Sequence, residues 1–97
     1  MAQKIKDEKI DFLFKAILTL QDSDECYSFF EDLCTISELQ EMSKRFYAAK
    51  LLNDNHIYND IAEQTGLSTA TISRVNRCLK YGSDGYITML ERIEKRK

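Results

Sequence analysis

The segment Ile57–Leu79, IYNDIAEQTGLSTATISRVNRCL, constrains the fold of this chain more than any other part of it. Its small, turning and apolar residues have the spacing of two short helices joined by a tight turn. A first helix of about residues 57–64 contains Ala62, where a second helix must cross closely, and Gly66 follows where the chain must reverse. Glycine adopts the left-handed backbone that most residues resist. The segment therefore predicts a helix-turn-helix over residues 57–79.

The second helix of this unit is expected to start at Ser68, whose hydroxyl can cap the first amide groups. Leu67 is expected to pack in the turn. Ile72, Val75 and Leu79 recur at three- and four-residue spacing and so predict a buried stripe. The side chains that remain face outward: Thr69, Ala70, Ser73, Arg74, Arg77 and Lys80. This pattern favours a DNA-reading helix, and a purely structural helical hairpin is the alternative.

The charge distribution supports DNA binding, although the chain has fourteen basic and sixteen acidic residues and a net charge of −2. Residues 1–34 contain four basic and eight acidic groups, and residues 35–63 contain three and five. Residues 64–83 contain three basic groups and no acid, and the last fourteen residues contain four and three. Phosphates repel carboxylates and release counterions to Lys and Arg. The helix-turn-helix therefore has the locally basic character that a modest, salt-sensitive DNA contact needs.

The rest of the chain predicts helices as well. Thr35 and Glu38 have the spacing of a capping box, which predicts a helix over residues 36–53. Further helices are expected over about residues 8–20, 24–34 and 85–94. Their predicted apolar stripes are Leu13, Phe14, Ile17 and Leu18; Phe29, Phe30 and Leu33; Leu39, Met42, Phe46 and Ala49; and Tyr86, Leu90 and Ile93.

These patterns predict an all-α fold of about six helices, because proline is absent and no apolar run alternates as in a strand. A chain of 97 residues forms one domain and leaves about a third or more of its unfolded surface exposed. A homodimer would cover more of the apolar stripes and would present two recognition helices to a two-fold DNA site.

Several functional classes are not expected. The one histidine, His56, falls in a polar turn without a ligand cluster, so neither a metal nor a catalytic site is predicted, and no enzyme. Cys26, Cys34 and Cys78 lack a C-x-x-C pair and are predicted to be buried thiols, with redox sensing by Cys78 as an alternative. No apolar run has membrane length, and AQKIKDEK lacks a signal-peptide core, so a cytoplasmic protein without a membrane partner is expected.

From Thr35 to about Ile93 the chain resembles the tryptophan repressor family, and especially its small Trp-repressor-related members whose effector is undefined. The resemblance rests on Thr35, Arg45, the turn at Gly66, the run Ala70-Thr71-Ile72-Ser73-Arg74, and Leu79-Lys80. It implies a single domain over residues 1–97 that forms an intertwined homodimer and represses transcription. Within it, residues 1–34 would supply the dimerisation helices.

The resemblance also implies a place for an effector. In the family, two arginines hold the indole of tryptophan, and they match Arg45 and Arg74 here, while a pocket-lining threonine matches Thr35. The family's glycine after the second arginine is Val75 here, and its amine-binding serine is Cys78, a poorer hydrogen-bond partner. An added valine costs about 1–3 kcal/mol in a tight slot. We expect no tryptophan binding and no cofactor. Another small-molecule co-repressor stays open.

Two other interpretations of the arginines also stay open. Arg45 lies four residues after Glu41, which is the spacing of a surface ion pair on a helix. The alternative for Arg74 is a contact with a DNA phosphate.

The residues expected to meet DNA are Ser68, Thr69, Ala70, Thr71 and Ser73, flanked by Asn59, Arg77 and Lys80. Asn59 stands where the family has a guanine-contacting arginine, so the operator sequence should differ. Short hydroxyl side chains reach base edges through water, which favours readout by bridging waters and duplex shape. The alternative function is a helical protein-interaction module that does not bind DNA.

Overall fold

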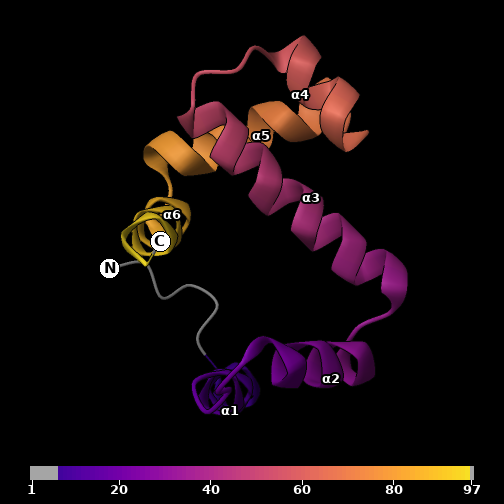
Figure 1. Ribbon diagram of the computed structural model, residues 1–97, viewed down its shortest axis with the longest axis vertical. Helices are drawn as coiled ribbons and strands as arrows, with labels where there is room; N and C mark the ends of the chain where they lie inside the picture. The colour runs from indigo at the N-terminus through magenta and orange to yellow at the C-terminus, as the bar shows by residue number, and fades with distance from the viewer. Residues whose placement is uncertain (1–6, 97) are drawn as a thin grey trace. The chain divides into compact units, whose positions relative to one another are not determined.

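The computed structural model describes residues 7–96, and all of its regular structure is helical (Figure 1). The helices are α1 (Glu8–Ile17), α2 (Ser23–Leu33), α3 (Ile36–Asn53), α4 (Tyr58–Thr65), α5 (Thr69–Tyr81) and α6 (Gly85–Lys95). The predicted all-α class with six helices is thus confirmed for the described chain. Residues 1–6 and 97 of the predicted domain lie outside the described residues. Residues 1–6 begin the predicted dimerisation segment, and residues 2–6 begin the motif AQKIKDEK.

Short-range capping determines where the helices begin and end. The Thr35 hydroxyl accepts a hydrogen bond from the Glu38 amide at 3.0 Å, and the Glu38 carboxylate accepts one from the Thr35 amide at 2.9 Å, so the predicted capping box is confirmed. The first helix was predicted to reach Leu20, and this is wrong. The Thr19 hydroxyl and amide both donate to the Ala16 carbonyl, which closes a tight turn after Ile17.

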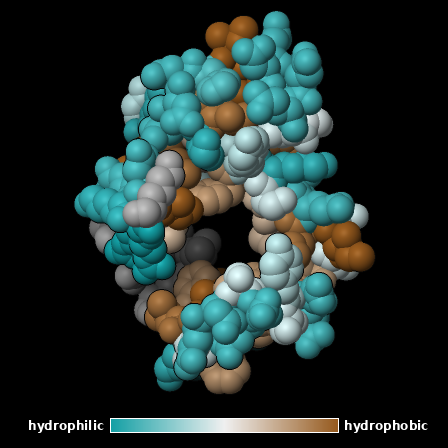
Figure 2. All heavy atoms as spheres, in the orientation of Figure 1, coloured by the Kyte–Doolittle hydropathy of each residue, from teal (hydrophilic) through white to brown (hydrophobic). Residues whose placement is uncertain are grey.

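The contacts divide the chain into a unit of residues 1–39 and a unit of residues 40–97. In the first unit, α1 and α2 bury no residue. Their predicted stripes are half-buried at best, and Phe14, Leu18 and Leu33 are exposed. Figure 2 shows such apolar side chains, in brown, at the surface among hydrophilic ones. Within the described residues of this unit, the apolar faces of α1 and α2 therefore do not form a buried core of their own.

The second unit contains the hydrophobic core. It consists of Ala48, Ala49 and Leu51 of α3, Ile61 of α4, Leu67 of the following turn, and Ile72, Val75 and Leu79 of α5. The stripe predicted on α3 was therefore wrong in part: Ala49 is buried, but Met42 is exposed and Leu39 and Phe46 are half-buried. The core includes the C-terminal half of α3, where the adjacent Ala48 and Ala49 are fully buried in the same cluster as residues of α4 and α5.

The turn between α4 and α5 has the predicted left-handed glycine. Gly66 has φ +75°, and its amide donates to the Ala62 carbonyl at 2.8 Å. Thr65 precedes Gly66 and is buried, and this burial was not predicted from the sequence. Its hydroxyl donates to the Ile61 carbonyl at 2.7 Å and accepts from the Leu67 amide at 3.2 Å. These two hydrogen bonds connect the last turn of α4 with the first residues of the turn that follows it.

The cysteines correct a second prediction. Cys26 and Cys78 are exposed and Cys34 is partly exposed in the chain, so the expected burial of the thiols is wrong. Cys78 stands between Val75 and Leu79 in the sequence, but a helix rotates by about 100° per residue. That rotation turns Cys78 away from the core that its neighbours enter.

We predict that Gly66→Ala destabilises the protein by about 1–2 kcal/mol, because a side chain strains the left-handed backbone even where space is open. Gly85→Ala is the matched control. A Cβ at Gly85 meets nothing within 4 Å, and its φ is not in the left-handed region. Urea unfolding followed by circular dichroism measures both variants. Equal stability of the two would contradict the role given to Gly66.

Candidate nucleic-acid interface

The two sides of α5 differ completely in burial. Three residues of α5 are almost completely buried: Ile72 is 0% exposed, Val75 2% and Leu79 8%. They lie in the core with Ile61 of α4. Figure 1 shows α4 lying against α5, as their contacts require. On the outward side, Thr69, Ala70, Arg74, Arg77 and Lys80 are exposed, and Ser73 is half-buried. The predicted division of this helix into a buried stripe and an outward face is confirmed.

The start of α5 is capped by its own hydroxyl groups. Ser68 accepts a hydrogen bond from the Thr71 amide at 3.1 Å, and its hydroxyl donates to the Thr71 hydroxyl at 3.0 Å. Ser68 thus has the predicted capping role, and Thr71 is half-buried beside it. Of the predicted base-reading hydroxyl groups, that of Thr69 lies exposed on the first turn without a part in this cap.

The outward face of α5 is basic. Arg74, Arg77 and Lys80 are exposed, and none of them pairs with a carboxylate within residues 7–96. The adjoining helix differs, because α4 has Asp60 and Glu63 at its surface next to the exposed Asn59. An anionic partner is therefore attracted to α5 and weakly repelled by parts of α4.

The residues aligned with the family's effector site lie in different surroundings. Val75 is a core residue. Arg45 is half-buried, whereas Arg74 and Cys78 are exposed. Thr35 caps α3 in the first unit. No ion pair joins Arg45 to Glu41 in the described chain, so that alternative is not supported.

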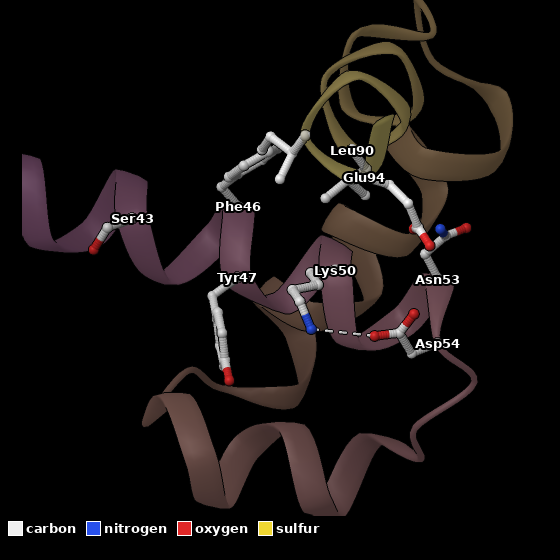
Figure 3. A pocket seen from close by; sticks show the side chains of 9 residues that line it. Ser43, Phe46, Tyr47, Lys50, Asn53, Asp54, Leu90 and Glu94 are labelled. Atoms are coloured by element: carbon white, nitrogen blue, oxygen red, sulfur yellow. Dashed lines mark hydrogen bonds and ion pairs between the residues drawn. The ribbon is translucent and has the colours of Figure 1, made fainter. Parts of the chain in front are cut away.

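Two hollows adjoin α3 in the second unit, and neither is lined by Arg45 or Arg74. The first, of about 360 Å³, lies between α3 and α6 (Figure 3). Phe46, Tyr47 and Leu90 supply its apolar lining, and the ion pair between Lys50 and Asp54 at 3.3 Å crosses its rim. The second is an open hollow that includes Cys78, together with Phe46 and Tyr86, whose rings stack 6.1 Å apart.

Residues 7–96 offer neither a metal cluster nor a membrane-spanning helix. No group of three or more His, Cys, Asp and Glu side chains in that range could hold a metal ion. His56 is exposed in the turn before α4. No described helix has both the length and the apolar character needed to cross a membrane.

Comparison with known proteins gives a consistent result. Residues 8–94 match the Trp repressor protein family. The chain is 48% identical over 92 residues to YerC, an uncharacterised protein of Bacillus subtilis strain 168, a match that covers 95% of this chain and 88% of YerC.

Two solved structures have the same fold. The crystal structure of a TrpR-like protein from Eubacterium eligens has a TM-score of 0.90 and 55% identity, with 96% of each chain covered. A candidate Trp repressor from Staphylococcus aureus also has a TM-score of 0.90, with 45% identity and coverage of 97% of this chain and 96% of that one. The fold, the helix-turn-helix and the family match agree, and the chain belongs to the Trp repressor family.

Proposed function

We propose that this chain is a DNA-binding transcriptional repressor that acts as a cytoplasmic homodimer through the outward face of α5. The observation that carries the proposal is the combination on one helix of a fully buried stripe with an exposed face that has three cations and no acid. Burial holds the helix in one orientation, and the cations favour phosphate. Membership of the Trp repressor family supports the same function.

The contacts divide along the helix. Thr69 and Ala70 at the N-terminal end of α5 meet base edges, where their methyl groups suit the methyl group of thymine. Arg77 and Lys80, further along, meet phosphates. Ser73 is half-buried and Asn59 stands on the first turn of α4, so these two flank the contact. Ser68 and Thr71 serve mainly by shaping the start of the helix.

Exposed apolar surface supports the proposed homodimer. Phe12 is 74% exposed and Leu18 is 84% exposed, and neither α1, α2 nor α6 buries a residue in the single chain. Surfaces of this kind mark interaction sites. Because each subunit has few cations, binding through one recognition helix is weak, so two recognition helices are needed.

Because the family match runs through both units, from residue 8 to 94, we assign them to one domain.

Regulation by tryptophan is not part of the proposal. Val75 stands where the family has a glycine that leaves room for the indole ring of tryptophan. Its side chain is part of the core and is only 2% exposed. Thr35, Arg45, Arg74 and Cys78 stay candidates for a different small-molecule co-repressor. DNA binding is therefore expected without added tryptophan.

Selection of bound fragments from random genomic DNA tests the function directly. The purified protein should enrich fragments that share a two-fold sequence, and binding should weaken as salt rises. If no fragment is enriched and affinity purification instead recovers one stable protein partner, the chain is a protein-interaction module.

Substitutions on α5 separate the two kinds of contact. Arg77→Ala and Lys80→Ala should weaken binding to all sequences and reduce the salt slope by about 1 each, because each removes a phosphate contact. Thr69→Ala should change the order of preference among sites. Lys15→Ala, an exposed cation of α1, is the control for lost charge. Unchanged relative site affinities in Thr69→Ala would rule out the assignment of Thr69 as a base reader.

The homodimer has its own test. Phe12→Ser should lower the dimer population in sedimentation equilibrium, because a surface apolar side chain contributes to stability chiefly where a partner covers it. Lys15→Ser on the same helix is the matched control. A wild-type chain that sediments as a monomer at all concentrations would contradict the proposed dimer.

Isothermal titration with L-tryptophan tests the effector. No heat of binding is expected at ligand concentrations up to the millimolar range, because Val75 occupies the slot. Clear micromolar binding would show that the core around Val75 opens for the ligand.

A further inference from the structure

The last residue of α5, Tyr81, is an aromatic side chain that the core does not use. It is 84% exposed. Its position is fixed by the next residue: the Gly82 amide donates to the Cys78 carbonyl at 2.9 Å, and a Cβ at Gly82 would clash with that carbonyl. The chain can therefore turn away directly after α5, and Tyr81 stays in the last turn of the helix.

Tyr81 lies on the same side of α5 as the candidate DNA contacts. Ala70, Arg74 and Arg77 precede it by eleven, seven and four residues, which are the spacings of one helix face. Ile72, Val75 and Leu79 occupy the opposite face. The Tyr81 ring thus continues the outward face beyond Arg77 and stands next to Lys80.

The length of the helix decides what Tyr81 can reach. Eleven residues at 1.5 Å each place Tyr81 about 16 Å along the helix from Ala70, and the major groove of B-DNA is about 12 Å wide. When the Ala70 end of α5 meets base edges, the Tyr81 end lies beyond the groove, at the level of the phosphate backbone. Tyrosine hydroxyl groups are among the usual donors to phosphate oxygens.

We propose that the Tyr81 hydroxyl donates a hydrogen bond to a backbone phosphate of bound DNA, at the end of α5 opposite the base-reading residues. This inference rests on the proposed DNA-binding function. A phenol is neutral, so it adds affinity without releasing a counterion, unlike Arg77 and Lys80. It also fixes the angle of the helix in the groove, because a phosphate contact at one end restricts rotation about the other.

The test compares Tyr81→Phe with the wild type on the fragments selected from genomic DNA and on random duplex. Loss of the hydroxyl should weaken binding about three- to tenfold on both, and the slope of log affinity against log salt should stay unchanged. Tyr81→Lys should instead steepen the slope by about 1, since it places a cation at the phosphate. Tyr47→Phe and Tyr47→Lys, at a 46% exposed tyrosine of α3 outside the proposed dimerisation segment, are the matched controls.

The possible failures are distinguishable. If the wild type binds DNA and Tyr81→Phe binds equally well, the inference about Tyr81 is wrong and the proposed function stands. An equal loss in Tyr47→Phe also overturns the inference, because the effect would then not be local to α5. If the wild type binds no DNA fragment, the proposed function fails and the role of Tyr81 fails with it.

Discussion

The packing of Ile72 and Val75 against Ile61 and the two alanines of α3 is the interaction on which the arrangement of this protein depends. Ile61, Ile72, Ala48 and Ala49 are all fully buried in one hydrophobic cluster. Because this contact fixes the rotation of α5 about its axis, it also determines which side chains face outward. The basic face is therefore a consequence of the core rather than an independent feature.

Most features decided within four residues were predictable from the sequence, and features decided by distant contacts were not. The end of α1 is an exception, because the hydrogen bonds from Thr19 to the Ala16 carbonyl are local and the helix was still predicted too long. The Thr35–Glu38 capping box, the Ser68 cap and the left-handed Gly66 each depend on local hydrogen bonds or on backbone freedom. The buried face of α3 depends on where other helices cross it, and periodicity alone placed it wrongly. Thr65 was missed because a buried threonine has no apolar signal, although its place just before a turn glycine suits a hydroxyl that bonds back along the helix.

Val75 connects the core with the proposed loss of tryptophan control. In the family, the matching position is a glycine beside the ligand, whereas here a branched side chain belongs to the hydrophobic core. Its burial stabilises the helix-turn-helix through the protein's own packing, about 1.5–3 kcal/mol for a fully buried side chain of this size. A recognition helix held in place by its own core has less need of a ligand to order it. The outward residues Arg74 and Cys78 of the same helix are left for other contacts.

The sparse charge on α5 explains why dimerisation and the neutral contact of Tyr81 belong together. Arg77 and Lys80 on each subunit give four phosphate contacts in a dimer, which correspond to a salt slope of about −4. Binding that relies on these cations alone would fall steeply between dilute and physiological salt. A second subunit multiplies the contacts, and a neutral donor at the end of each helix adds affinity that salt does not screen. Under the proposed function, an acidic chain with few cations thus reaches useful affinity by combining the symmetry of the dimer with uncharged hydrogen bonds.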